Sequence, residues 1–268
     1  MNLRLAVCLF FASIACENAW GDTLRLAVTT SFHNSGLSDI LLPIIGEDLD
    51  IEVHLLVVGT GQALRLGRAG DVDALLVHSK SAEEKFVENG YATHRREIMY
   101  NDFVLIGRAA DPAKVAEAET AVDAFSSIAS AEATFVSRGD DSGTHNAELS
   151  LWRDARLNPN GFGEWYRAVG AGMGAALNTA SGMDAYILAD RASWLNFGNK
   201  GDLVILFEGD SALFNQYSFL PIDPVRHPHV KGVLANRLEE WLAGPRAGKI
   251  IDGYRLGGES LFTHNARN

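Results

Sequence analysis

The stretch IEVHLLVVGTGQALRLGRAG, residues 51–70, shows the unit from which this chain folds. Residues 51–58 form an apolar run of strand length, and the residues beyond the next turn have the spacing of a short helix that ends near Gly67 or Gly70. The turn itself is Gly59-Thr60-Gly61, which offers unhindered amides and one hydroxyl. A strand that enters a helix through such a turn is typical of an α/β protein.

The same order of strand, turn and helix recurs along the chain. Apolar periodicity predicts further strands and helices, the strands at 24–28, 73–77, 98–107, 134–136, 203–207 and 217–222 and the helices at 37–45 and 233–242. Turns rich in hydroxyls or bare amides occur at 29–31, 59–61, 137–145 and 170–174. In open α/β sheets such turns gather at the carboxyl ends of the strands, where ligands bind. The sequence therefore predicts a pocket built from these turns.

One of these turns, SRGDDSGTH at 137–145, has the groups that hold a small oxyanion. Arg138 provides a planar fork of donors that stays charged. Ser142, Gly143 and Thr144 would place hydroxyls and N–H groups at the positive end of a helix predicted to begin near Asn146. The motif predicts an anion site that relies on hydrogen bonds and a single cation.

An alternative interpretation of the same motif needs no ligand. Ser142 or Thr144 would cap the first turn of the helix, and Arg138 would pair with Asp140 or Asp141. The residues alone leave both interpretations open.

The N-terminus predicts export. A basic start and an apolar run at 5–15 precede small residues and a cut after Gly21, the pattern of a signal peptide over residues 1–21. The run is shorter than the roughly 20 residues that span a bilayer. The protein is therefore expected in the periplasm, with a lipid anchor at Cys16 as the alternative. Cys8 and Cys16 both precede the cut, so the mature chain would hold no disulfide.

Composition limits the class of protein. The chain has 268 residues, 47% of them hydrophobic, and no low-complexity linker, which favours one compact unit or two interwoven lobes. Its formal net charge is −11, so nucleic acid is not an expected partner. A buried anion site remains compatible with that charge, because nearby dipoles act on it more strongly than distant, screened surface charges.

Other chemistries find weaker support. The turn at 59–61 lacks the ending of a nucleotide P-loop, and His227-Pro228-His229 lacks a third metal ligand nearby. A Ser/His hydrolase is the rival of another class, with His33, His78 or His145 as the base for Ser31, Ser79 or Ser142, although no Gly-x-Ser-x-Gly elbow is present. We expect no catalytic residue, no cofactor and no resident metal.

Ordered sequence blocks give a more specific indication. In chain order they are LRLA (24–27) with TTS (29–31), SGL (35–37), VVGTGQAL (57–64), GDVD (70–73), VH (77–78), MYNDFV (99–104), SRGDDSGTH (137–145) and GMG (172–174). Over essentially the whole mature chain they resemble the periplasmic tungstate-binding proteins of the TupA type, which capture substrate for an ABC importer. The RxDxSGT core is also similar to one in phosphate-binding relatives, so that block alone does not choose the anion.

The resemblance implies a two-lobed, class II periplasmic binding protein, with mixed sheets flanked by helices and a hinge between the lobes. Residues 22–103 and 216–268 would form lobe I and residues 104–215 lobe II, with crossings near 102–104 and 215–217. The implied ligand-binding residues come from both lobes, and they are Thr30, Ser31, Thr60, Gly61, Arg138, Ser142, Gly143, Thr144 and Gly174.

The resemblance also implies the partners. The ligand would be tungstate, with molybdate or phosphate as alternatives, and a monomer would deliver it to an ABC transporter permease. One position departs from the family, which usually has three threonines before the serine, because Val28 stands at the first of them. A missing charge-assisted hydrogen bond would weaken binding roughly tenfold to a hundredfold. If residue 28 belongs to the strand core, the departure has no effect.

Overall fold

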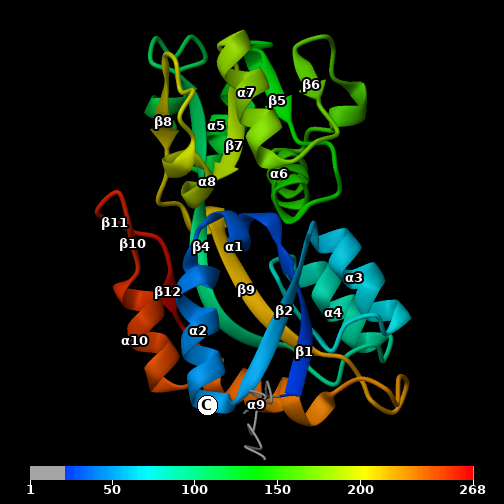
Figure 1. Cartoon of the computed structure of the whole chain (residues 1–268). Coiled ribbons are helices and arrows are strands. Elements are labelled where there is room, and N and C mark those ends of the chain that lie inside the picture. The colour runs from blue at the N-terminus through cyan, green and yellow to red at the C-terminus, as the bar shows by residue number, and fades with distance from the viewer. Residues whose placement is uncertain (1–21, 268) are drawn as a thin grey trace, which may run out of the picture.

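The computed structural model describes residues 22–267 and consists of two halves, one above the other (Figure 1). The predicted signal peptide with Cys8 and Cys16 lies outside the described residues. In the part of the chain that is described, no helix is long and apolar enough to cross a membrane.

The lower half contains a mixed sheet. Strand β1 (Asp22–Thr29) lies parallel to β2 (Ile51–Val58) on one side and to β3 (Ala74–Val77) on the other. Strand β9 (Phe214–Pro221) pairs with β3, and β4 (Arg96–Arg108) pairs with β9 and with the short β12 (Thr263–His264), all antiparallel. The strands at 51–58 and 203–207 have the predicted bounds.

Helices cover both faces of this sheet. One face packs on α2 (Leu37–Leu49), α9 (Gly232–Ala243) and α10 (Pro245–Gly253), and the other on α3 (Thr60–Ala69) and α4 (Lys80–Glu88). In Figure 1 α2 and α10 lie to the left of β1 and β2, α3 and α4 lie to the right, and α9 runs along the bottom. The β10–β11 hairpin (Arg255–Leu256 and Glu259–Ser260) follows α10.

The upper half repeats the arrangement on a smaller scale. Strand β5 (Phe135–Ser137) lies parallel to β6 (Tyr166–Ala168) and β7 (Tyr186–Asp190), while β4 pairs antiparallel with β7 and β8 (Leu203–Phe207). The short η1 (Val115–Glu117), α5 (Ala121–Ser130) and α6 (Gly143–Asp154) cover one face. Helices α7 (Met173–Met183) and α8 (Arg191–Asn196) cover the other.

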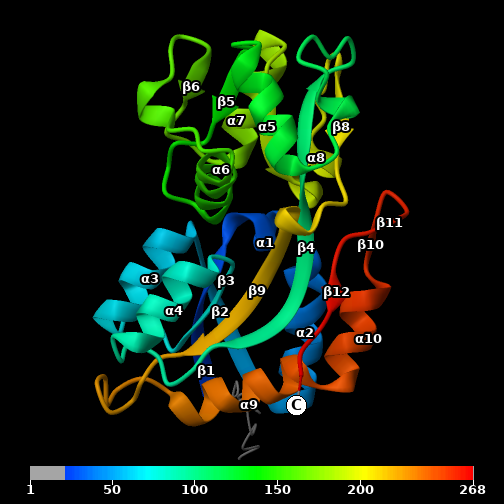
Figure 2. The same cartoon turned by 180° about the vertical axis from the view of Figure 1, so that it is seen from behind.

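Strands β4 and β9 join the two halves, and Figure 2 shows them side by side. Strand β4 pairs with β9 as far as Asp102 and with β7 from Phe103 onward. The turn η3 (Ser211–Leu213), just before β9, still contributes Leu213 to the upper core. The predicted hinge positions at 102–104 and 215–217 lie in these two strands, and movement about them stays a prediction.

Two predicted helix starts were too late. The helix expected from Gln62 begins at Thr60, and the one expected near Asn146 begins at Gly143. In the second case the Ser142 hydroxyl accepts a hydrogen bond from the amide of His145 at 3.2 Å, which starts the helix three residues earlier. The correction places Gly143 and Thr144 inside the first helical turn.

Candidate functional site

Most of the predicted ligand-binding residues lie in the first turn of a helix. Thr30 and Ser31 are the first two residues of α1 (Thr30–Asn34), Thr60 and Gly61 those of α3, and Gly143 and Thr144 those of α6. The first N–H groups of a helix have no partner within it and lie at its positive end. Three helices thus direct two amides each beyond their N-termini.

Two of these helices are capped in the same way, at the third amide. The Thr29 hydroxyl accepts from the amide of Phe32 at 3.3 Å, and the Ser142 hydroxyl accepts from the amide of His145. The amides at the first two positions of α1 and α6 therefore stay free for another acceptor. Helix α3 has Gly59 as its N-cap, without a side-chain bond.

The two halves touch at these turns. A methyl group added to Gly143, in the upper half, would lie 2.3 Å from Cε1 of His78, which follows β3 in the lower half. A methyl group on Gly61 would lie 2.7 Å from Oδ2 of Asp141. Real Cβ contacts are not that short. At Gly143 the neighbours include the backbone carbonyl of His78 at 2.8 Å, so only glycine fits there in this arrangement, whereas at Gly61 the exposed Asp141 carboxylate can turn aside. The contacts place α3 and α6 on opposite sides of one cleft.

Arg138 lies at the end of β5 and is only 5% exposed. Its guanidinium donates to Oδ2 of Asp140 at 2.5 Å, and Oδ1 of the same carboxylate accepts from the amide of Ser142 at 3.2 Å. Among the described residues, Nε of Arg138 has no hydrogen-bond partner. The pairing expected by the alternative interpretation is therefore present, and it leaves part of the fork available.

Two hydroxyl groups of the predicted site are likewise buried without a hydrogen-bond partner among the described residues. Thr60 is 1% exposed and Thr144 is 2% exposed, and neither Oγ1 has a partner among the described residues. A buried polar atom left unpaired costs about 1 to 3 kcal/mol. Together with Nε of Arg138, these hydroxyls are the groups that a buried anion would satisfy.

The hydroxyl of Ser31 is already engaged. It lies 3.0 Å from Oγ1 of Thr29, 3.1 Å from Nε2 of His78 and 2.9 Å from the Tyr217 hydroxyl. A serine hydroxyl has one proton and two lone pairs, so three partners use its capacity. What Ser31 can offer to an anion is its amide at the second position of α1.

Gly174 differs from the other predicted residues. It is the second residue of α7 but is exposed, and a methyl group added there would meet nothing within 4 Å. The loop before α7 does reach Arg138, because the amide of Ala171 donates to the Arg138 carbonyl at 3.2 Å. No contact brings Gly174 itself to the other predicted residues in the described part of the chain.

His78 and Tyr217 support the site from the lower half. Their rings lie 4.7 Å apart between centroids, and His78 also faces Gly143. Burial, helped by the nearby charge of Arg138, lowers the pKa of His78 to about 3, so the imidazole is neutral near pH 7. Burial likewise raises the pKa of Tyr217 and keeps its phenol protonated.

Sequence reasoning did not single out Tyr217 or Asp190. Asp190, which ends β7, is fully buried, and burial raises its pKa although Arg138 acts in the opposite direction. Its Oδ1 caps α8 by accepting from the amide of Ser193 at 2.9 Å. An Asp that directly follows an apolar run and precedes a helical stretch is a typical N-cap, and this pattern could have drawn attention to Asp190. No local pattern marks Tyr217.

The contacts of Ser31 also bear on the rival hydrolase. Ser31 and His78 are within hydrogen-bonding distance, but a base with a pKa near 3 has little capacity to take a proton at neutral pH. Nδ1 of His78 has no orienting partner among the described residues. In the Ser142 and His145 pair, the histidine amide rather than its ring bonds to the serine. Neither pair is arranged as a nucleophile and its base.

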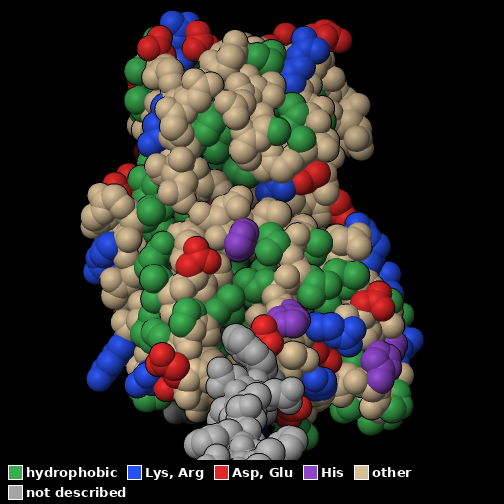
Figure 3. Space-filling view, in the orientation of Figure 1, with side chains coloured by type: hydrophobic (Ala, Val, Ile, Leu, Met, Phe, Trp, Pro, Cys, Tyr) green, Lys and Arg blue, Asp and Glu red, His purple; other side chains and the backbone are tan. Residues whose placement is uncertain are grey.

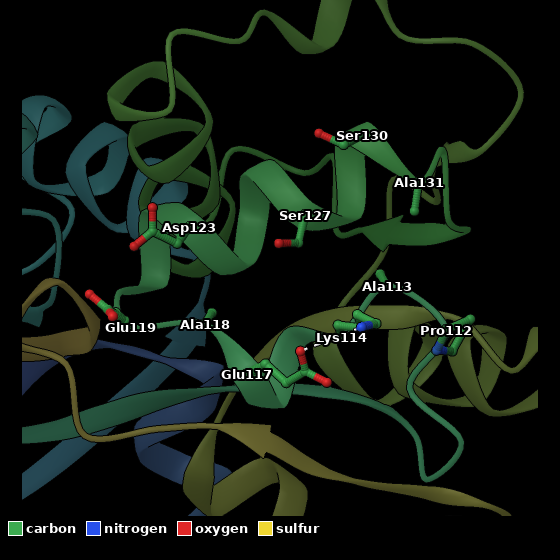
Figure 4. Close-up of a pocket in the computed structure, with 10 residues that line it drawn as sticks. All are labelled: Pro112, Ala113, Lys114, Glu117, Ala118, Glu119, Asp123, Ser127, Ser130 and Ala131. Carbon is green, nitrogen blue, oxygen red and sulfur yellow. Dashed lines mark ion pairs between the residues drawn. The ribbon is translucent and has the colours of Figure 1, made fainter.

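One cavity lies at the cleft between the halves, and another pocket lies away from it. A cavity of about 390 Å³ between the halves is lined by residues that include His78, Gly143 and Asn215. A second pocket of about 730 Å³ lies in the upper half between η1 and α5, and its lining residues, drawn in Figure 4, include none of the predicted site. The cleft, not that pocket, contains the convergent donors.

Comparison with known proteins identifies the family. Residues 17–246 match the PBP superfamily domain. The tungstate-binding protein TupA of Peptoclostridium acidaminophilum is 43% identical over 248 residues, which are 91% of this chain and 86% of that protein. The chain belongs to the TupA family. Its predicted α/β periplasmic-binding-protein fold and its predicted role as a binding protein instead of an enzyme are both confirmed by that membership.

Solved structures of the TupA family agree with this one. The tungstate-binding protein TupA from Desulfovibrio alaskensis G20 is 43% identical, has a TM-score of 0.82 and is matched over 92% of this chain and 100% of that chain. The structure named as the tungstate ABC transporter from Geobacter sulfurreducens is 45% identical, with a TM-score of 0.79, over 87% of this chain and 98% of that chain.

The departure at Val28 has a structural explanation. Its side chain is fully buried and belongs to the hydrophobic core that packs beneath α2 and α9. Thr29, the next residue, supplies the hydroxyl that caps α1. A side chain at position 28 therefore points into the core and not toward the first turn of α1.

Proposed function

We propose that this protein captures tungstate in the cleft between its two halves and delivers it to the permease of an ABC importer. Arg138 is the observation on which the proposal depends, because a buried guanidinium with an unpartnered Nε lies beside the N-terminus of α6. Asp140 already pairs with this guanidinium, but a buried donor without an acceptor still costs about 1 to 3 kcal/mol, and an anion that accepts from Nε would remove that cost. The names of the relatives point to tungstate as that anion.

The proposed ligand contacts come from both halves. From the lower half they are the amides of Thr30, Ser31, Thr60 and Gly61 and the hydroxyl of Thr60. From the upper half they are the guanidinium of Arg138, the amides of Gly143 and Thr144, and the hydroxyls of Ser142 and Thr144. The amide of Ser142 already bonds to Asp140, so its hydroxyl is the group on offer. Gly174 remains among the proposed ligand contacts only through its backbone amide.

The proposed mechanism is closure about β4 and β9. About six hydrogen bonds, several of them charge-assisted, would give an affinity near −12 kcal/mol, or nanomolar, after the cost of closing the cleft. The contacts of Gly143 with His78 and of Gly61 with Asp141 would be the ones that closure makes. The lobes would be those proposed from the sequence, 22–103 with 216–268 and 104–215.

The choice of tungstate over phosphate depends on the family and not on the contacts of Asp140. Near neutral pH phosphate keeps a proton, which needs an acceptor in the site. Each oxygen of Asp140 accepts one hydrogen bond, from Arg138 or from Ser142, and keeps a second lone pair that could accept this proton. Tungstate and molybdate share charge and shape, so these contacts do not separate them, and only the family favours tungstate. We further propose that the protein acts as a monomer in the periplasm.

Calorimetry on the ligand-stripped mature chain tests the proposal. Tungstate should bind one to one with nanomolar affinity, while phosphate and sulfate should give no heat. Arg138→Lys keeps the charge but loses the planar fork, and Arg138→Ala loses both, so both variants should bind orders of magnitude more weakly. Thermal unfolding without ligand controls for folding. Unchanged affinity in a folded Arg138→Ala protein would exclude this site.

A further inference from the structure

Helices α3 and α4 border a groove that reaches the proposed site. Two cavities lie along it, of about 350 and 400 Å³, and they share the lining residues Leu64, Arg68, Ala82 and Lys85. The first cavity is also lined by Thr60, Gly61 and Asp141, which belong to the cleft or touch it. The groove therefore runs from the surface near Tyr91 to the N-terminus of α3.

The groove is basic although the whole chain is acidic. Arg65, Arg68 and Lys85 line the cavity nearest the cleft, and Asp141 is the one acidic residue among its described lining residues. Figure 3 shows Lys and Arg side chains gathered at the right edge, over α3 and α4. The formal net charge of the chain is −11, so this concentration of positive charge contrasts with the rest.

The three cations are free to act on an incoming anion. All three are exposed, and none takes part in an ion pair between described residues. Arg65 donates Nε to Gln62 at 2.9 Å, a neutral partner, and Arg68 lies over the ring of Tyr91 at 5.5 Å. At the neighbouring opening of the cleft, by contrast, Lys80 is 3.9 Å from Glu84, so its charge is offset.

Electrostatics decides what such a groove does. A dianion that approaches a protein of charge −11 is repelled on average, but exposed charges act only over about 8 to 10 Å at physiological salt. Within that distance a cleft lined by charge of one sign can raise association rates by about 10-fold to 1,000-fold. The contribution of exposed cations to the final bound state is small, because water screens them.

We propose that the α3–α4 groove is an entry path that attracts tetrahedral oxyanion dianions and leads them to the cleft. It acts on the association rate and does not form part of the final binding site. This inference depends on the proposed function, since it presupposes that the cleft binds such an anion.

Stopped-flow fluorescence with tungstate tests the entry path on the mature chain. Arg65→Gln with Lys85→Gln removes two groove charges and leaves Arg68 on Tyr91. The matched control, Arg153→Gln with Lys249→Gln, removes two exposed charges from the end of α6 and from α10. We expect the groove variant to associate about 3-fold to 10-fold more slowly at low salt, with the same dissociation rate, and the deficit to disappear near 0.5 M salt. The control should keep the wild-type rates.

Other outcomes separate the two proposals. Equal slowing in both variants would mean that only the net charge matters, and it would overturn the entry path. Faster dissociation in the groove variant would make these residues part of the bound site, which also overturns it. If tungstate binds the wild type and both variants at one rate, the entry path fails while the binding function stands. A wild-type protein that binds no oxyanion would overturn both.

Discussion

Gly143 and His78 meet across the cleft, and the space between them admits no further atom. If this arrangement is the closed one, Gly143→Ala must displace the imidazole or hold the halves apart, although it keeps the amide of residue 143. We expect tungstate affinity to fall at least tenfold, as measured by calorimetry. Gly182→Ala is the matched control, because it adds the same methyl group to a glycine of α7 that has nothing within 4 Å and lies outside the proposed site. Equal weakening in both variants would contradict the closure contact.

Val28 permits a second test with single residues. Val28→Thr restores the residue usual in the family but buries a hydroxyl in the core. We expect it to lower the free energy of unfolding by about 1 to 3 kcal/mol, measured with urea, and to leave tungstate affinity unchanged. Tighter binding would show instead that position 28 reaches the ligand.

At the scale of elements, helix α6 carries the Arg138 side of the proposed site and is held by a buried carboxyl group. Glu148 is 2% exposed and accepts from Trp152 at 3.1 Å and from the Tyr166 hydroxyl of β6 at 2.7 Å. Burial raises the pKa of Glu148 from 4.5 to about 7. The folded protein therefore holds a proton that the unfolded chain releases above pH 4.5, and stability falls as pH rises from 4.5 to 7.

Glu148→Gln removes this titration and keeps an oxygen that can accept both hydrogen bonds. Relative to wild type, the variant should gain about 1 to 3 kcal/mol of unfolding free energy between pH 5 and pH 8, measured with urea at both values. Glu88→Gln, at an exposed position on α4, should show no such gain. A gain of the same size in both variants would rule out burial of Glu148 as the cause.

At the scale of the whole molecule, the two halves are joined where β4 changes partner. Arg191 of α8 donates to Asp102 at this point, with Nε 2.8 Å from Oδ1, and its guanidinium lies 3.7 Å from Glu259 of the lower half. Closure about such a joint should make the molecule more compact when an anion binds. We expect small-angle scattering to record a smaller radius of gyration with tungstate for the wild type and no change for Arg138→Ala.

Binding should also stabilise the whole molecule. At a ligand concentration 1,000 times the dissociation constant, the native state gains about 4 kcal/mol, which corresponds to a rise in Tm of roughly 8 to 16 °C for a chain of this size. Differential scanning calorimetry with tungstate, and with sulfate as the control, measures this rise. The same rise with sulfate would indicate a general salt effect.

Local sequence patterns determined the order of strands and helices and most of the proposed site. The periods of strands and helices depend on near neighbours, and so do the small or hydroxyl residues at helix N-termini, which is why Arg138, Thr60 and Gly143 could be found from sequence. The anion was inferred from family resemblance, because tetrahedral oxyanions share the same chemistry of recognition.

Only the tertiary structure decided which groups meet in the cleft. The Ser31 hydroxyl bonds to His78, 47 residues away, and to Tyr217, 186 residues away. Because these contacts use its hydrogen-bonding capacity, the hydroxyl stabilises the site and is not available to a ligand. The contact of Gly143 with His78 likewise joins separate halves. No local pattern encodes such pairs, because they arise when β4 and β9 cross between the halves and bring distant turns together. The sequence therefore determined the donors, and packing decided which of them remain free for a ligand.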